Sequence, residues 1–113
     1  MQKISLGTAA REQLEIARST SAARSSATVY GGHEHALRQT LIALLAGASL
    51  GEHENPGEAT VHVLTGHVQL IAGPETGEGH AGDLLVIPDA RHGLHAVEDS
   101  VLLLTAVPRG HAL

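Results

Sequence analysis

The sequence contains almost no aromatic residues: Tyr30 is the single one, and Phe, Trp and Cys are absent. Proteins that bind single-stranded nucleic acid usually stack the bases on aromatic rings, so the sequence does not predict such a platform. Without cysteine there is no disulfide framework, no thiol chemistry and no cysteine-ligated zinc. The 113-residue chain is long enough for one core, which must be built from Val, Leu, Ile and Ala.

Positive charge and long apolar runs are also scarce. Seven Lys and Arg residues against twelve Asp and Glu residues give a formal net charge of −5, which leaves no basic footprint for a phosphate backbone. The longest apolar run, 41–50, is interrupted by Gly47 and Ser49 and is too short to span a bilayer. The N-terminus has no apolar signal segment. We therefore expect a cytoplasmic protein that binds no membrane and makes no direct contact with nucleic acid.

Glycine and proline divide most of the chain into short apolar segments. One short helix is predicted within Thr8–Arg18, and a small polar linker, Ser19–Ser26, follows it. The chain is accordingly divided into a helix and linker, 1–26, and a barrel, 27–113. Short strands without crossover helices predict an all-β barrel or sandwich of at least seven strands. The clearest strands are 37–45, 59–64, 67–72, 84–87 and 101–107, and the glycine-rich stretch 73–82 is predicted to be a hairpin loop.

Two segments have the spacing of a known pair of motifs. GASLGEHENPGEATVHVLTG, which begins at Gly47, resembles the first cupin motif, G-x5-H-x-H-x3,4-E-x6-G. GDLLVIPDARHGLHA, which begins at Gly82, resembles the second, G-x5-P-x-G-x2-H-x3-N. The matching positions are Gly47, His53, Gly66, Gly82, Pro88 and His92. The chain is therefore similar, over most of its length, to small RmlC-like cupins of the cupin 2 conserved-barrel type. The resemblance implies a double-stranded β-helix, or jelly-roll, barrel.

The same resemblance implies a site. Metal-binding cupins take two His and a Glu from the first motif and a third His from the second, and these hold Fe, Mn, Ni, Cu or Zn. Position by position, His53 and His92 match ligands, and Asn55 stands where the second His would be. The expected metal ligands are His53, Asn55 and His92. The same three side chains, with Val61 and Val63 on the inward face of their strand, are expected to line a ligand pocket.

The carboxylate position is the main departure from the family pattern. Counting back from Gly66 puts Ala59 there, and Glu58 lies one residue early, on the outward face. Other histidines are candidates to complete the ligand set: His33, His35 and His62. Glu52 and Glu58 are candidate general bases because they are close to His53 in the sequence.

Three functions fit these observations, because cupins host many unrelated activities. The first is a module that binds a small molecule, with or without a weakly held divalent metal. The second is a metal-dependent enzyme of the dioxygenase or isomerase type, with His53 and His92 as ligands. The third is a ligand-sensing or regulatory partner that acts through another protein. The missing Glu and second His favour the binding module over the enzyme.

A homodimer is the expected assembly. A small barrel with an open strand edge exposes unpaired backbone groups, which proteins usually cover, and two-fold pairing is the commonest symmetric solution. Several aliphatic residues, including Leu64, fall on the outward face by alternation. His95 also faces outward and is a candidate for a subunit interface. His67 and His80 lie in or beside turns, and we expect their side chains to be solvated.

Overall fold

The computed structural model describes residues 1–54 and 57–108, which form one helix and nine strands. In chain order these are α1 (Leu6–Arg18), β1 (Arg24–Gly31), β2 (Arg38–Leu44), β3 (Ser49–His53), β4 (Gly57–Thr65), β5 (His67–Ala72), β6 (Glu75–His80), β7 (Leu84–Val86), β8 (His92–Ala96) and β9 (Ser100–Pro108). In this described part, no helix is both long enough and apolar enough to cross a membrane.

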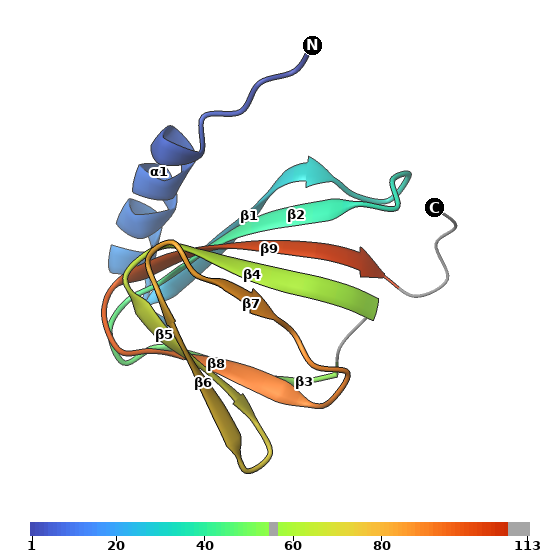
Figure 1. The fold of residues 1–113 in the computed structure, drawn as a ribbon. Helices are drawn as coiled ribbons and strands as arrows, with labels where there is room; N and C mark the ends of the chain where they lie inside the picture. The colour runs from blue at the N-terminus through green and yellow to red at the C-terminus, as the bar shows by residue number, and fades with distance from the viewer. Residues whose placement is uncertain (55–56, 109–113) are drawn as a thin grey trace.

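The strands form two antiparallel sheets that face each other (Figure 1). Within the described residues, the larger sheet has five strands in the order β1-β2-β9-β4-β7. The smaller has four, in the order β3-β8-β5-β6. The chain passes repeatedly from one sheet to the other, as in a jelly roll. The predicted all-β barrel with one short N-terminal helix is therefore confirmed.

Aliphatic side chains fill the space between the sheets. Along β4 the inward residues Ala59, Val61 and Val63 are buried, and their neighbours are more exposed, which is the alternation expected of a strand with one face on the core. The buried members of this core are Ile42, Leu44, Ala59, Val61, Val63, Val68, Leu70, Ile87, Leu94, Ala96, Leu102 and Ala106. Among the described residues, the two sheets contribute to one core built from Val, Leu, Ile and Ala, as the sequence predicted.

Helix α1 begins two residues earlier than the sequence predicted. The Ser5 hydroxyl accepts a hydrogen bond from the Thr8 backbone N–H at 3.3 Å and so caps the N-terminus. The helix ends at Arg18, whose positive charge suits the negative end of the helix dipole.

The helix covers part of the outer face of the five-stranded sheet. It packs against β1 and β2, and fully buried Ala17 joins a second apolar cluster with residues of β2 and β9. Gln13, also buried, accepts a hydrogen bond from the Ser25 hydroxyl. Leu64 packs against this second cluster. The N-terminal segment therefore covers its own sheet, and Leu64 contributes to that packing.

Two segments differ from the sequence prediction. Residues 24–26, predicted to be linker, open strand β1 and pair with β2. Within 73–82, predicted to be a loop, β6 pairs with β5. Gly79 is a buried position of β6, where an added Cβ would lie 2.9 Å from Leu85 and 3.1 Å from Val63. The side chains of Leu85 and Val63 fill the space that a larger side chain at position 79 would need.

Gly66 lies where the chain leaves β4 and enters β5 in the other sheet. Its φ is +92°, and an added Cβ would lie 2.2 Å from the Ser100 Oγ and 2.4 Å from the Asp99 carbonyl oxygen. The hydroxyl of fully buried Ser100 accepts a hydrogen bond from the His67 N–H at 3.0 Å and donates one to the Glu98 carbonyl at 2.8 Å. Both the backbone conformation and the close approach therefore require glycine.

Replacing Gly66 with Ala should destabilise the protein more than replacing Gly82 with Ala. Both glycines have a positive φ, +92° and +93°, but an added Cβ at Gly82 meets nothing within 4 Å. We expect Gly82→Ala to cost about 1–2 kcal/mol of backbone strain. Gly66→Ala should cost about 1–3 kcal/mol more, because the Cβ overlaps Ser100. Chemical denaturation measures both, and equal losses would contradict the importance of the Ser100 contact.

Candidate functional site

The structure brings His53 and His92 together at the end of the four-stranded sheet. His53 is the last residue of β3 and His92 the first of β8, and the two are direct partners in the strand pairing. Their ring centroids lie 4.6 Å apart, with the rings tilted by 60°. His92 is buried, with 4% of its surface exposed, whereas His53 is exposed. One ring of the pair therefore lies in the barrel interior and the other at its surface.

Backbone carbonyls fix which nitrogen of each ring is available. The His53 Nδ1 lies 3.0 Å from the Gly51 carbonyl oxygen, and the His92 Nδ1 lies 2.9 Å from that of Ala90. A carbonyl oxygen only accepts hydrogen bonds, so each Nδ1 carries a proton. In the neutral rings the lone pair is then on Nε2, which can bind a metal ion or accept a hydrogen bond from a ligand.

Arg91, which directly precedes β8, contacts Glu52 of β3, so it links the two strands that carry these rings. Its guanidinium lies 3.3 Å from the Glu52 carboxylate and 3.7 Å from that of Glu54, and it also donates to the Glu52 carbonyl at 3.3 Å. The three side chains are exposed, so each ion pair contributes little to stability. Glu52, a candidate general base, is engaged by Arg91, and Glu58, the other candidate, is exposed at the outward-facing positions of β4.

The other residues predicted to line the site are Val61, Val63 and Asn55. Val61 and Val63 point inward but are fully buried members of the core, with 1% and 0% exposure. Ala59, at the position of the family's Glu, is also inward and buried, so no carboxylate enters from there. Asn55 lies outside the described residues.

The candidate compensating histidines stay apart from His53 and His92. His62 is half-buried at an outward position of β4, opposite Leu84 of β7. His33 and His35 are both exposed between β1 and β2, where the His35 ring lies 5.5 Å from that of Tyr30. In residues 1–54 and 57–108, no three His, Asp or Glu side chains are grouped so as to hold a metal ion.

The structure also shows a second pair of histidine rings, on the hairpin formed by β5 and β6. His67 and His80 are direct cross-strand partners, and their rings stack with centroids 4.1 Å apart. The His67 Nε2 lies 2.6 Å from a carboxylate oxygen of Glu78, which also accepts a hydrogen bond from Gln69 at 3.2 Å. His67 is only partly exposed, unlike the solvated side chain expected. Recognising β6 as a strand would have placed His80 opposite His67.

The structure is similar to several solved structures. A conserved protein of unknown function from Streptococcus pyogenes is 30% identical over 78% of this chain and 76% of that one, with a TM-score of 0.70. An RmlC-like cupin protein from Desulfovibrio desulfuricans is 26% identical over 75% of this chain and 82% of that one, with a TM-score of 0.66. Salicylate 1,2-dioxygenase from Pseudoaminobacter salicylatoxidans is 20% identical over 89% of this chain and 32% of that one, with a TM-score of 0.72. No protein-family model and no curated protein matches the sequence.

Replacing His67 with Ala should raise the pKa of Glu78. The hydrogen bond from His67 is the largest cause and holds this pKa below its ordinary value; desolvation opposes it, and Gln69 and the charges of His67 and His80 lower the pKa by smaller amounts. A lowered carboxyl pKa stabilises the fold above the unfolded-state pKa, and this stabilisation is lost as the pH falls through the folded-state pKa. NMR titration of the Glu78 carboxyl measures the shift. In His95→Ala, which removes a ring bonded to Ser49, the Glu78 pKa should not change, and a shift as large as that in His67→Ala would contradict the assignment.

Proposed function

The chain belongs to the cupin family, and we propose that its barrel binds a small organic molecule beside His53 and His92. The observation that carries this proposal is the pair of adjacent imidazoles, each with Nδ1 held by a backbone carbonyl. Because the backbone carbonyls already orient the rings, their two Nε2 lone pairs can bind a ligand without a further loss of side-chain freedom. Buried His92 provides the inner contact and exposed His53 the outer one.

We further propose that a divalent transition metal binds here only loosely. Two imidazoles supply half of the four donors of a structural zinc site, and the described residues add no third His, Asp or Glu. A carboxylate would also add negative charge that favours a dication, and Ala59 removes it. The same donor set gives no specific support to a metal-dependent oxygenase or isomerase, so binding of a small molecule is the function we propose.

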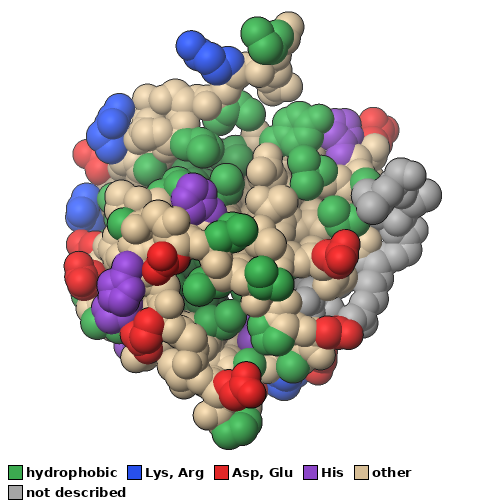
Figure 2. All heavy atoms as spheres, viewed as in Figure 1, with side chains coloured by type: hydrophobic (Ala, Val, Ile, Leu, Met, Phe, Trp, Pro, Cys, Tyr) green, Lys and Arg blue, Asp and Glu red, His purple; other side chains and the backbone are tan. Residues whose placement is uncertain are grey.

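The proposed assembly is a homodimer formed through the outer face of the five-stranded sheet. Helix α1 packs on β1 and β2. At the other edge, Leu84 and Val86 of β7 are 61% and 74% exposed, beside His62 and Thr60 of β4. Figure 2 shows hydrophobic side chains gathered over the middle of the viewed face, where β7 and β4 run in Figure 1. An apolar patch beside an exposed strand edge favours pairing with a second copy.

Zinc titration of protein purified without a histidine tag tests the site. We expect one equivalent to bind with a dissociation constant of about 1 µM or weaker, because only two strong donors are present. The double variant His53→Ala/His92→Ala should lose this binding and stay folded. The matched control is His67→Ala/His80→Ala, which removes the other adjacent ring pair and should keep the binding. Stoichiometric zinc in the first variant would show that the ligands are elsewhere, and zinc that survives a chelator would contradict loose binding.

Light scattering at micromolar concentration tests the dimer. We expect twice the mass of one chain, and an interface above about 2,000 Å² if the dimer is obligate. Val86→Glu places a charge in the proposed interface and should give the mass of one chain. Val97→Glu, at a partly exposed apolar position between β8 and β9, should leave the dimer intact. A wild-type protein with the mass of one chain would rule the dimer out.

A further inference from the structure

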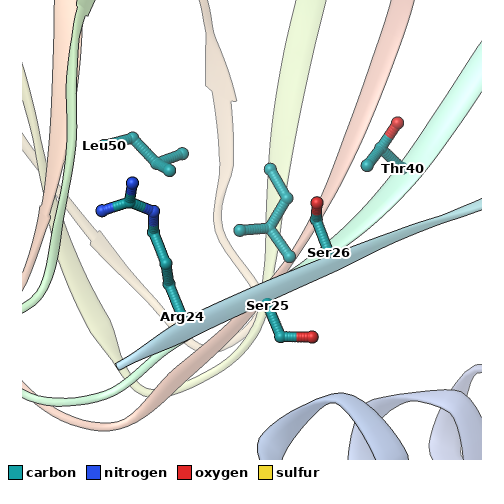
Figure 3. Close-up of a pocket in the computed structure, with 6 residues that line it drawn as sticks. Arg24, Ser25, Ser26, Thr40 and Leu50 are labelled. Atoms are coloured by element: carbon teal, nitrogen blue, oxygen red, sulfur yellow. The ribbon is translucent and has the colours of Figure 1, made fainter. Parts of the chain in front are cut away.

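A separate cavity opens at the side of the barrel, between the edge strands of the two sheets. β1 is an edge strand of the five-stranded sheet, and β3 is an edge strand of the four-stranded sheet. The cavity holds about 230 Å³ and is lined by Arg24, Ser25, Ser26, Thr40, Ile42 and Leu50. We call the cavity that these six residues line the β1–β3 slot (Figure 3). It includes neither His53 nor His92.

One wall of the slot carries a guanidinium without an acidic partner in the described part of the chain. Arg24 donates a hydrogen bond to the Ser49 carbonyl at 3.3 Å, and this contact holds its head group across the gap between the sheets. In Figure 3 the guanidinium lies beside Leu50. A guanidinium has five N–H donors, so further donors stay available for an anion, in a chain whose net charge is −5.

Two hydroxyl groups lie across the slot from Arg24. In Figure 3 the side chains of Ser26 and Thr40 are on the same side of the β1 ribbon as Arg24 and Leu50, whereas Ser25 points the other way, toward the helix. The strand pairing gives the same arrangement, because Ser26 pairs with Ile42, and Thr40 lies two residues before Ile42 on β2. Neither hydroxyl is hydrogen-bonded to another side chain within residues 1–54 and 57–108, so both are free to bind a ligand oxygen.

The rest of the slot is apolar. Ile42, which is 7% exposed, and Leu50 come from opposite sheets and form its inner part. Pockets for drug-sized ligands hold about 300–1,000 Å³, so this cavity suits a smaller molecule. A guanidinium and hydroxyls beside two aliphatic side chains match an anionic oxygen group attached to a short hydrocarbon chain. The apolar inner part disfavours inorganic phosphate and sugars, which carry polar groups on every side.

We propose that the β1–β3 slot binds a short-chain aliphatic carboxylate. The carboxylate accepts hydrogen bonds from Arg24 and from the Ser26 and Thr40 hydroxyls, and the hydrocarbon chain packs between Ile42 and Leu50. This site goes beyond the proposed function, because it uses none of the residues that form the histidine pair.

Titration of the ¹⁵N-labelled protein with hexanoate tests the proposal. Amide signals of Ser26, Thr40 and Leu50 should shift in a saturable way. Affinity should rise about threefold to fourfold for each CH₂ added from butanoate to hexanoate, as expected for burial of the chain. Arg24→Gln should weaken binding about tenfold or more, because it removes a charged hydrogen bond. Arg11→Gln, which removes the same charge from the exposed helix surface, should leave the affinity unchanged.

The proposal would be overturned by no saturable shift with hexanoate, by equal affinity for 1-hexanol or for inorganic phosphate, or by unchanged hexanoate binding in Arg24→Gln. The variant His53→Ala/His92→Ala separates the two sites. Hexanoate binding that persists there supports an independent slot even if zinc binding fails. Hexanoate binding that is lost there would mean that the carboxylate occupies the histidine site instead, and the slot proposal would be wrong.

Discussion

The contact between the Gly66 backbone and Ser100 fixes how the two sheets join. At this corner the chain passes from β4 to β5, and close beside it from β8 to β9, so two crossings between sheets meet at one point. The buried Ser100 hydroxyl satisfies the His67 N–H and the Glu98 carbonyl there. Because β5 and β8 are neighbours in the four-stranded sheet, this corner sets where that sheet lies over the core, and β8 begins with His92.

The polar inward face of β1 decides where the core stops. Val, Leu, Ile and Ala fill the space between β2, β9 and β4 and the opposite sheet. The residues of β1 that share the inward face with Ile42 and Leu44 are Ser26 and Arg24, and both are exposed. Apolar packing therefore ends at β2, and the space between the edges of β1 and β3 stays open as the slot. Its polar wall and apolar inner part both follow from this boundary.

The sequence predicted those elements in which the apolar pattern is unambiguous. β4, β5 and β9 are rich in Val, Leu and Ile, and their strands were expected close to where they lie. β1 and β6 were missed because the serines of β1 and the glycines of β6 carry no strand pattern until a neighbouring strand supplies the hydrogen bonds. The motifs put His53 and His92 in one site, but the carbonyls that orient their rings belong to loop and strand backbone, which side-chain patterns do not report. The Arg24 wall lies within a segment that was predicted to be linker.

A bulge in β3 explains why strand alternation alone could not place Leu50 of the slot and His53 of the histidine pair on the same face. Leu50 pairs with Leu94 and His53 pairs with His92, so β3 uses one residue more than β8 between these pairs. Gly93 lies opposite the extra residue, where an added Cβ would be 3.0 Å from the Leu50 carbonyl oxygen. Residues three apart, such as Leu50 and His53, point to opposite faces of a regular strand. The bulge lets both of these side chains point inward. In regular register Glu52 would take the place beside His92, so the bulge both creates the histidine pair and keeps it on the face that Leu50 presents to the slot.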